Sequence, residues 1–278
     1  MKNGLLLAML LGLGTAVTAQ TLPTVSHMDE LVDRKYRAAV RYYDRNWLPL
    51  PGGPAGAYGY DRIERHDSAS ISWRTRRYVL ATGRLVLQQF WKGEAPGYVL
   101  EGGSREWYES GQLKEEVQYR DGQLVGELRT YYASGQRRRV QSFGVITGNS
   151  YCYDASGKAR PSCPPYHKFA KLLVRGYGTE QYMALVQSLY AKALPAGYRQ
   201  PEELRVYYAF RVDSTGQVRD GRVLNAYPGW DKAAVAPALE AAILQAIGRL
   251  VFAGPATVEG EATNDLIEGI VQAKRVRR

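Results

Sequence analysis

The chain has 278 residues, and its 37 Lys and Arg outnumber its 27 Asp and Glu to give a net charge of +10 at pH 7. This charge is spread along the chain, which argues against a dedicated nucleic-acid-binding domain, because such a domain concentrates its charge on one face or segment. The run 137–139 (RRR) and residues 274–278 (KRVRR) are local exceptions, and we predict a solvated strand and a basic, frayed tail for them.

Residues 1–19 have the pattern of a signal peptide. Lys2 provides a short positive start, residues 5–13 an apolar core, and residues 17–19 (VTA) a small-residue cleavage site. The apolar stretch is short for a membrane span, and no later stretch is more apolar, so no transmembrane segment is expected in the mature chain. We therefore predict cleavage after Ala19 and an exported, periplasmic protein. A secreted protein and an uncleaved N-terminal anchor are the less favoured alternatives.

Residues 20–59 are predicted to form an N-terminal helix followed by a Pro/Gly linker. The helix is expected over residues 28–46, where an imperfect apolar stripe is made by Leu31, Tyr36, Val40 and Tyr43. The run 48–56 (LPLPGGPAG) interrupts it and leads to the first strands, which we expect at residues 60–63 and 70–78.

A short motif is repeated in the middle of the chain. Residues 107–112 (WYESGQ) return 24 positions later as residues 131–136 (YYASGQ), and an Asp-Gly pair lies between them. Self-similarity at a fixed period is typical of repeat proteins. From Leu113 to Tyr119 every second residue is apolar or large, with one exception at Glu115, and this period of two predicts a half-buried strand.

The turns between these strands are expected to depend on glycine. Gly111, Gly122 and Gly135 each follow a Ser or Asp at the end of a predicted strand. A two-residue turn between twisted strands requires positive φ, which glycine adopts without steric cost. We therefore predict these three glycines as structural turn residues.

Fainter copies of the motif flank the central ones at residues 78–85 and 151–158. The block from residue 76 to residue 158 resembles the variant MORN repeat, whose units read as a Tyr-Tyr pair, Asn-Gly or Ser-Gly, and a strand to the next Gly. The resemblance implies an antiparallel β-meander of hairpin repeats over residues 60–160. It also implies a role in binding or scaffolding rather than a shared catalytic mechanism.

The chain has two cysteines, Cys152 and Cys163. An even pair in an exported protein is normally a disulfide, so we predict this bond. It would attach the last repeat strand to the proline-rich linker. A metal site is the less favoured alternative, because only His167 lies near and no C-x-x-C spacing is present.

A second unit follows the linker of residues 161–178. We predict, in order, a helix containing Tyr182, Leu185, Val186 and Leu189, a hairpin with strands at 204–212 and 217–226, a helix from Pro237, and a strand at 265–273. This order describes a small α+β domain over residues 179–273. The predicted fold class of the whole chain is therefore α+β.

This second unit resembles the periplasmic C-terminal domain of TonB-type energy transducers. The resemblance lies in residues 205–218 (RVYYAFRVDSTGQV) and in residues 223–225 (VLN) before the second helix. It implies that the final strand lies at a sheet edge, where a partner peptide pairs with it by β-strand addition. The residues so implicated are Leu266, Glu268, Ile270 and Gln272. The alternative is that the basic tail merely protects this edge from aggregation.

Catalytic and metal-binding residues are not apparent in the sequence. His27, His66 and His167 lie in separate segments, and no spacing gathers them as metal ligands. His66, Asp67 and Ser68 are not a triad, because adjacent residues on a strand point to opposite faces. We expect no enzyme activity, cofactor or metal, and no nucleic-acid partner.

Two function classes remain from the sequence. The favoured one is an exported, non-catalytic protein-binding or scaffolding protein, linked to envelope transport through its TonB-like domain. The alternative is a cell-envelope hydrolase whose site is assembled from scattered residues. The identity of the partner and the oligomeric state stay open.

Overall fold

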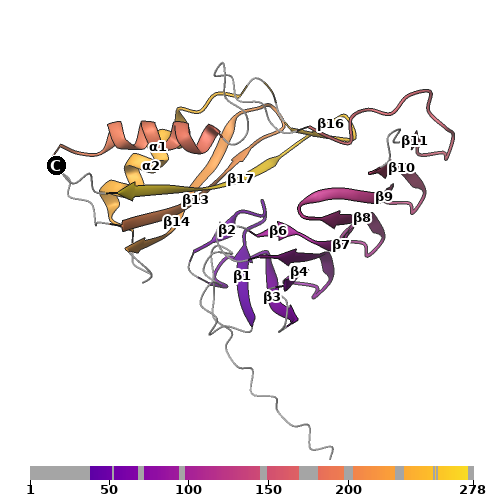
Figure 1. Ribbon diagram of the computed structural model, residues 1–278, viewed down its shortest axis with the longest axis horizontal. Coiled ribbons are helices and arrows are strands. Elements are labelled where there is room, and N and C mark those ends of the chain that lie inside the picture. Colours follow the sequence, from indigo (N-terminus) through magenta and orange to yellow (C-terminus); the bar gives the residue numbers. More distant parts are fainter. Residues whose placement is uncertain are drawn as a thin grey trace, which may run out of the picture.

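The computed structural model describes residues 38–51, 53–67, 72–93, 98–144, 149–168, 181–196, 203–228, 235–252, 254 and 256–274. It is mostly antiparallel β-structure with two helices, so the fold class is α+β (Figure 1). The predicted signal peptide, at residues 1–19, lies outside the described residues. No helix formed by the described residues is long and apolar enough to cross a membrane.

An eleven-stranded sheet, which we call the repeat sheet, occupies residues 38–152. Its order is β11-β10-β9-β8-β7-β5-β4-β3-β1-β2, with the short β6 paired to β5, and each pair is antiparallel. Most neighbours in the sheet are neighbours in sequence, which makes it a meander. The strands are β1 Ala38–Tyr43, β2 Pro49–Leu50, β3 Gly59–Asp67, β4 Ser72–Val79, β5 Leu85–Lys92, β6 Val99–Leu100, β7 Gly102–Trp107, β8 Leu113–Arg120, β9 Gln123–Tyr131, β10 Arg137–Phe143 and β11 Ser150–Cys152.

The predicted N-terminal helix is wrong where the structure describes it. Residues 38–43 form strand β1, which pairs with β3 along its whole length, while residues 28–37 lie outside the described residues. The burial pattern has a period of two, since Ala39, Arg41 and Tyr43 are buried and their neighbours are half-buried. Val40 and Tyr43, assigned to one helical stripe, therefore lie on opposite faces of a strand. The repeat sheet begins at least as early as residue 38 rather than at residue 60.

The repeated motif forms a ladder of similar turns. Tyr108 N–H donates to the Gln112 carbonyl and Gly111 N–H donates to the Tyr108 carbonyl. Tyr132, Gln136 and Gly135 repeat this pattern. The Tyr108 hydroxyl also donates to the Tyr131 carbonyl at 2.9 Å, and the Tyr132 hydroxyl to the Tyr153 carbonyl at 2.8 Å. Each tyrosine therefore ties its own turn to the next one along the sheet.

The three predicted turn glycines all have positive φ, at +92° for Gly111, +77° for Gly122 and +87° for Gly135. Only the Asp121-Gly122 turn has two residues, because Arg120 pairs directly with Gln123. The Ser-Gly turns are longer than we expected, since Trp107 pairs with Leu113 across five intervening residues.

The C-terminal unit contains a second antiparallel sheet of order β14-β13-β17, with both helices on one face (Figure 1). Its elements are α1 Gln181–Ala193, β13 Glu203–Val212, β14 Val218–Pro228, α2 Pro237–Gly248 and β17 Asp265–Lys274. The helices bury the largest core of the protein, in which Val186 and Tyr190 of α1 pack with Ile243 and Ile247 of α2 over Phe210. The predicted order of helix, hairpin, helix and strand is observed.

A third, small sheet was not predicted. It has the order β12-β15-β16, formed by β12 His167–Lys168, β15 Ala256–Val258 and β16 Glu261–Thr263. It joins the described part of the linker, residues 161–168, to the segment between α2 and β17. Its strands have two or three residues, which is too short for alternation to be recognised in the sequence.

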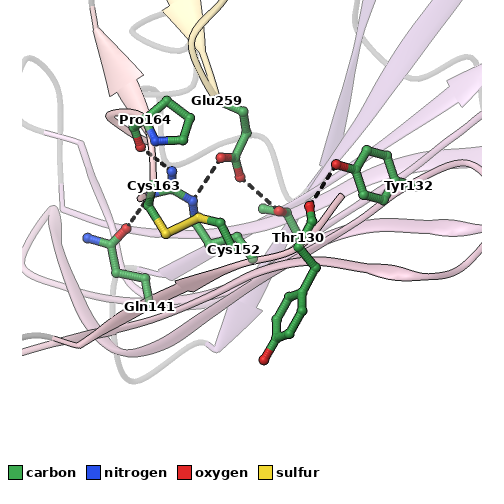
Figure 2. The surroundings of a disulfide bond; sticks show 9 residues. Thr130, Tyr132, Gln141, Cys152, Cys163, Pro164 and Glu259 are labelled. Carbon is green, nitrogen blue, oxygen red and sulfur yellow. Dashed lines mark hydrogen bonds and ion pairs between the residues drawn. A yellow bond between two sulfur atoms is a disulfide. The ribbon is translucent and has the colours of Figure 1, made fainter. Parts of the chain in front are cut away.

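The two cysteines are bonded in the structure, with a Cα–Cα distance of 5.5 Å (Figure 2). Cys152 ends β11, so the bond attaches the linker to the edge of the repeat sheet, as the sequence predicted. The figure also shows that several polar contacts gather beside the bond, between the linker, β9, β10 and the β15–β16 turn.

Candidate binding cleft

One face of the repeat sheet, which we call the inner face, carries a row of polar residues across almost every strand. The cross-strand registers place the following residues side by side from β1 to β11: Arg41, Asp61, Arg77, Leu87, Glu106, Glu115, Thr130, Arg139 and Cys152. Charged residues at the buried inner face of a sheet need partners, because an unpaired buried charge is costly. The C-terminal unit supplies partners at both ends of this row.

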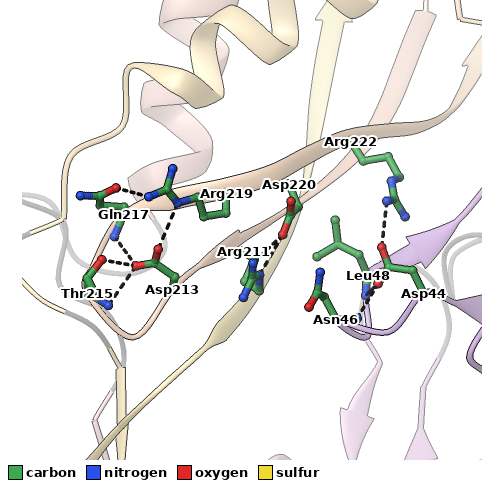
Figure 3. Close-up of polar contacts among 10 residues, drawn as sticks. All are labelled: Asp44, Asn46, Leu48, Arg211, Asp213, Thr215, Gln217, Arg219, Asp220 and Arg222. Carbon is green, nitrogen blue, oxygen red and sulfur yellow. Dashed lines mark hydrogen bonds and ion pairs between the residues drawn. The ribbon is translucent and has the colours of Figure 1, made fainter.

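The first anchor lies at the N-terminal end of the repeat sheet. Arg41 of β1 donates to Glu268 of β17 at 2.6 Å, and the Arg41 side chain is only 7% exposed. Beside it, Arg222 of β14 pairs with Asp44 at 2.9 Å and donates to the Pro49 carbonyl at 3.0 Å (Figure 3). Two strands of the C-terminal sheet therefore hold the β1–β2 hairpin.

The second anchor lies near the opposite end of the row. Arg139 of β10 donates to Glu259 at 2.8 Å, and the two side chains are 2% and 5% exposed. Glu259 lies in the β15–β16 turn with φ at +55°, and its other carboxylate oxygen accepts from the Thr130 hydroxyl at 2.8 Å (Figure 2). Arg139 also donates to the Pro164 carbonyl, next to the disulfide. This network joins the repeat sheet, the linker and the small sheet.

Glu115 adds a titratable group to the second anchor. Burial raises the pKa of Glu115 to about 7, which outweighs the opposing hydrogen bond with Tyr166, and the nearby Glu106 raises it further. Burial also raises the pKa of the Tyr166 hydroxyl, so this group stays protonated. Since Tyr166 belongs to the linker, its hydrogen bond with Glu115 of β8 is another link between the linker and the inner face.

A cleft of about 1030 Å³ lies between the two anchors. One wall is the inner face of the repeat sheet from β1 to β8, and the other is made by Tyr207 of β13 and part of β17. Seven aromatic rings line the cleft, namely those of Tyr43, Trp47, Trp91, Tyr98, Trp107, Tyr108 and Tyr207, and as many charged side chains lie among them. A large cleft that combines aromatic rings with converging polar groups is a candidate ligand-binding site.

The charged groups near the first anchor are paired with one another. Asp61 accepts two hydrogen bonds from Arg77, at 2.7 and 2.9 Å, and one from the Tyr43 hydroxyl at 2.5 Å. Burial disfavours the charged form of Arg41, but Glu268 outweighs this effect and the pKa of Arg41 is raised. Burial raises the pKa of Tyr43, so its hydroxyl stays a neutral donor. This part of the wall is therefore a connected network of ion pairs and hydrogen bonds.

Three buried donors on the repeat-sheet wall have no hydrogen-bond partner. They are Nε of Arg41 on β1, Oγ1 of Thr75 on β4 and Nε1 of Trp91 on β5, and all three residues line the cleft. A buried donor left unpaired costs about 1–3 kcal/mol. This part of the cleft therefore favours an occupant that brings hydrogen-bond acceptors.

The structure brings three of the four predicted partner-binding residues into the cleft. Leu266, Glu268 and Ile270 line it, and Leu266 and Ile270 also pack against Tyr207 on the same face of the C-terminal sheet. Gln272 does not line the cleft. Its backbone N–H points away from β13 and donates to the Gln187 side chain of α1 at 2.9 Å. The strand β17 does lie at a sheet edge, because it pairs with β13 and ends the sheet order.

The described residues contain no group of three or more His, Cys, Asp or Glu that could hold a metal ion. His66 is exposed at the end of β3, where its ring contacts Phe90 at 5.0 Å between centroids. His27 lies outside the described residues, as does Ser68, and the side chain of His167 is not described. A triad of His66, Asp67 and Ser68 is therefore not placed.

Sequence reasoning missed most of the cleft. Arg41 was assigned to a helix, and Arg77, Trp91 and Trp107 belong to strands whose inner faces could not be assigned without the register. The signal that points to Arg41 and Arg77 is the alternation of β1 and of the first half of β4, which gives each of these strands one mostly buried face.

The chain matches no protein-family model, no curated protein and no solved structure. We therefore describe the protein by its architecture, which is a repeat sheet anchored at two points by a small α+β unit. The cleft between these two parts is the candidate functional site.

Proposed function

We propose that this protein is an exported, non-catalytic binding protein whose cleft receives an extended segment of a protein partner. The segment adds to the edge of β17, and its side chains contact the aromatic wall of the repeat sheet. The observation that carries this proposal is the position of β17, which is both the edge of the C-terminal sheet and a wall of the cleft.

The hydrogen-bonding groups of the cleft support an extended peptide. In an antiparallel strand the N–H groups of alternate residues point to the same side. Since the Gln272 N–H points away from β13, the amides of Leu266 and Ile270 are directed to the same open edge. A peptide strand supplies carbonyl acceptors along its whole length, which suits both this edge and the donors of Thr75 and Trp91.

The ion pairs of the cleft favour binding over catalysis. Asp61 is held by Arg77, Glu268 by Arg41 and Glu106 by Lys114, at distances of 2.5–2.7 Å. A general acid or base must lie within hydrogen-bond reach of the proton that it transfers. These carboxylates already contact cations of the protein, so they are placed to orient a ligand.

The two sequence resemblances fit this role. The repeat motif and its tyrosine ladder support a MORN-like scaffold, and the hairpin, helix and edge strand of the C-terminal unit support a TonB-like domain. With the signal-peptide pattern of residues 1–19, they support a periplasmic location, where a link to envelope transport would lie.

Site-directed photocrosslinking tests the proposal. A photoreactive phenylalanine analogue replaces Leu266 in the cleft or, as the control, Tyr151, which is 56% exposed on β11. We expect the Leu266 position to crosslink a small set of partners in cells, and the Tyr151 position to crosslink none of them. The proposal fails if both positions give the same products or if the cleft position gives none.

A second variant tests strand addition. Ile270→Pro removes one amide from the edge of β17 without removing a bond to β13. Ile270→Val keeps the amide and is the matched control. If a folded Ile270→Pro protein gives the same crosslinks at Leu266 as Ile270→Val, the partner does not pair with this edge.

A further inference from the structure

The face of the repeat sheet opposite the inner face, which we call the outer face, carries a second row of aligned residues. The registers place Arg62, Arg76, Gln88 and Arg105 side by side on β3, β4, β5 and β7. Neighbouring strands are about 4.8 Å apart, so these four side chains extend over roughly 14 Å. Because side chains alternate along a strand, this row faces away from the cleft.

Three arginines on this face converge on a single carboxylate. Glu64 lies 2.5 Å from Arg62, 2.9 Å from Arg74 and 2.6 Å from Arg76, measured between side-chain nitrogen and oxygen atoms. We call these three arginines the arginine cluster. One carboxylate neutralises only one of the three cations, so the cluster keeps a surplus of two positive charges.

Two other arginines on the outer face do not compete for one carboxylate in this way. Arg105 lies 3.5 Å from Glu116, and Arg129 lies 2.7 Å from Glu127, so each of these arginines has its own carboxylate. Burial opposes ionisation of Glu64, but the hydrogen bonds from Arg74 and Arg76 outweigh it and lower the pKa of Glu64. The central carboxylate therefore stays charged.

Two donors of the arginine cluster are unpartnered. The Nε atoms of Arg74 and Arg76 are buried and have no hydrogen-bond partner. The Nε atoms themselves are covered, but the side chains as a whole are 33% and 27% exposed, so part of each arginine is open to a small solute. Arginine binds oxyanions through two parallel N–H bonds, and an anion with several oxygens satisfies more than one guanidinium at once.

The surroundings of the arginine cluster add an aromatic pair and a further hydrogen-bond donor. The rings of Tyr60 and Tyr78 stack at 5.2 Å between centroids, two residues from Arg62 and Arg76 on the same strands. They form one flat side of the cluster, and Gln88 lies beside Arg76 as a further donor. We propose that the arginine cluster, Arg62, Arg74 and Arg76, binds the phosphate group of a ligand on the outer face, at a site separate from the cleft.

Pyrophosphate binding to the whole protein tests this site. Isothermal titration calorimetry at low ionic strength is appropriate, because exposed charges are screened at higher salt. We expect the double variant Arg74→Gln/Arg76→Gln to weaken pyrophosphate binding by about tenfold or more. The matched control, Arg105→Gln/Arg129→Gln, removes the same charge from the same face and should change binding by less than about twofold.

A third variant gives the opposite result. Glu64→Gln removes the carboxylate that competes for the three arginines, so we expect it to tighten pyrophosphate binding by about fivefold. This variant also separates a binding role from a purely structural one. If the cluster served only to hold β3 against β4, Glu64→Gln would lower stability without creating tighter binding.

Vesicles distinguish the two sources of phosphate. Sedimentation with phosphatidylglycerol vesicles, with phosphatidylcholine vesicles as the control, reports a lipid headgroup, whereas pyrophosphate reports a soluble phosphate compound. Either form of binding supports the proposal if it is lost in Arg74→Gln/Arg76→Gln and kept in Arg105→Gln/Arg129→Gln. Binding of neither probe, or equal loss in both double variants, overturns it. The cleft variants leave this result unchanged, so it is independent of the proposed function.

Discussion

Arg139 and Glu259 form a buried ion pair between two parts of the chain that are 120 residues apart. The pair is only 2% and 5% exposed, so neither charge has water as an alternative partner. Truncating one member of such a pair leaves an uncompensated buried charge, which costs far more than loss of a surface pair.

Glu259→Gln should therefore lower the free energy of unfolding by about 3 kcal/mol. The matched control is Glu261→Gln on the same hairpin, where the glutamate is 76% exposed and pairs with Arg138 at 2.8 Å. This change should cost less than about 1 kcal/mol. Urea unfolding measures both, and equal losses would show that the Arg139–Glu259 pair is not the stronger anchor.

The raised pKa of Glu115 predicts how the free energy of unfolding depends on pH. Its pKa of about 7 lies above the ordinary value of 4.5, so the folded protein binds this proton more tightly than the unfolded chain does. The stabilisation that comes from binding this proton is complete below about pH 4.5 and is lost as the pH rises through about 7. Between pH 5 and pH 8 we expect this group alone to remove on the order of 2–3 kcal/mol.

Comparison of two neighbouring glutamine variants isolates this effect. Glu115→Gln should flatten the dependence of the unfolding midpoint on pH between pH 5 and pH 8. Glu116→Gln, on the outer face beside Arg105, should leave the wild-type dependence in place. The prediction is contradicted if both variants keep the same slope.

Loss of the Cys152–Cys163 bond should lower the free energy of unfolding. The bond closes a loop between residues 11 apart in sequence and lies next to the contact of Arg139 with the Pro164 carbonyl. Its removal in Cys152→Ser/Cys163→Ser should cost about 3 kcal/mol under the chain-entropy model. Thiol labelling of the unreduced protein should find no free cysteine, and two reactive thiols would refute the bond in solution.

The Asp121-Gly122 turn gives a backbone prediction. Gly122 has φ of +77°, and a side chain there would approach Val99 at 3.6 Å. Gly122→Val should lower the free energy of unfolding by on the order of 1 kcal/mol or more, because β-branched residues are strained at positive φ. Gly248→Ala is the control, since its φ is not positive and its surroundings are open. An unchanged midpoint for Gly122→Val would contradict the turn assignment.

The parts of the fold that could be predicted are those with a local cause. The turns at Gly111 and Gly135, the hairpin of β13 and β14, the start of α2 at Pro237 and the strand β17 all follow from residues close together in sequence. The disulfide followed from the predicted signal peptide and the count of cysteines.

The cleft could not be predicted, because its walls depend on contacts between distant residues. Arg41 is buried in β1 only because β3 and Glu268 satisfy it, and the same sequence was read as a helix without them. Glu259 belongs to no motif in the sequence, although its carboxylate holds both Arg139 and Thr130. Only the register of the whole sheet places these side chains on one face.

The long sequence separation of the two anchors has a consequence for the order of folding. The hairpins of the repeat sheet close over short loops, whereas Arg41 and Glu268 of the first anchor are separated by 227 positions and Arg139 and Glu259 of the second by 120. Contacts between distant residues form slowly, because the chain must first lose the entropy of a long loop. We therefore expect the repeat sheet to form before the C-terminal unit docks on it. Until that late step the inner row of charges faces water, and the cleft has only one wall.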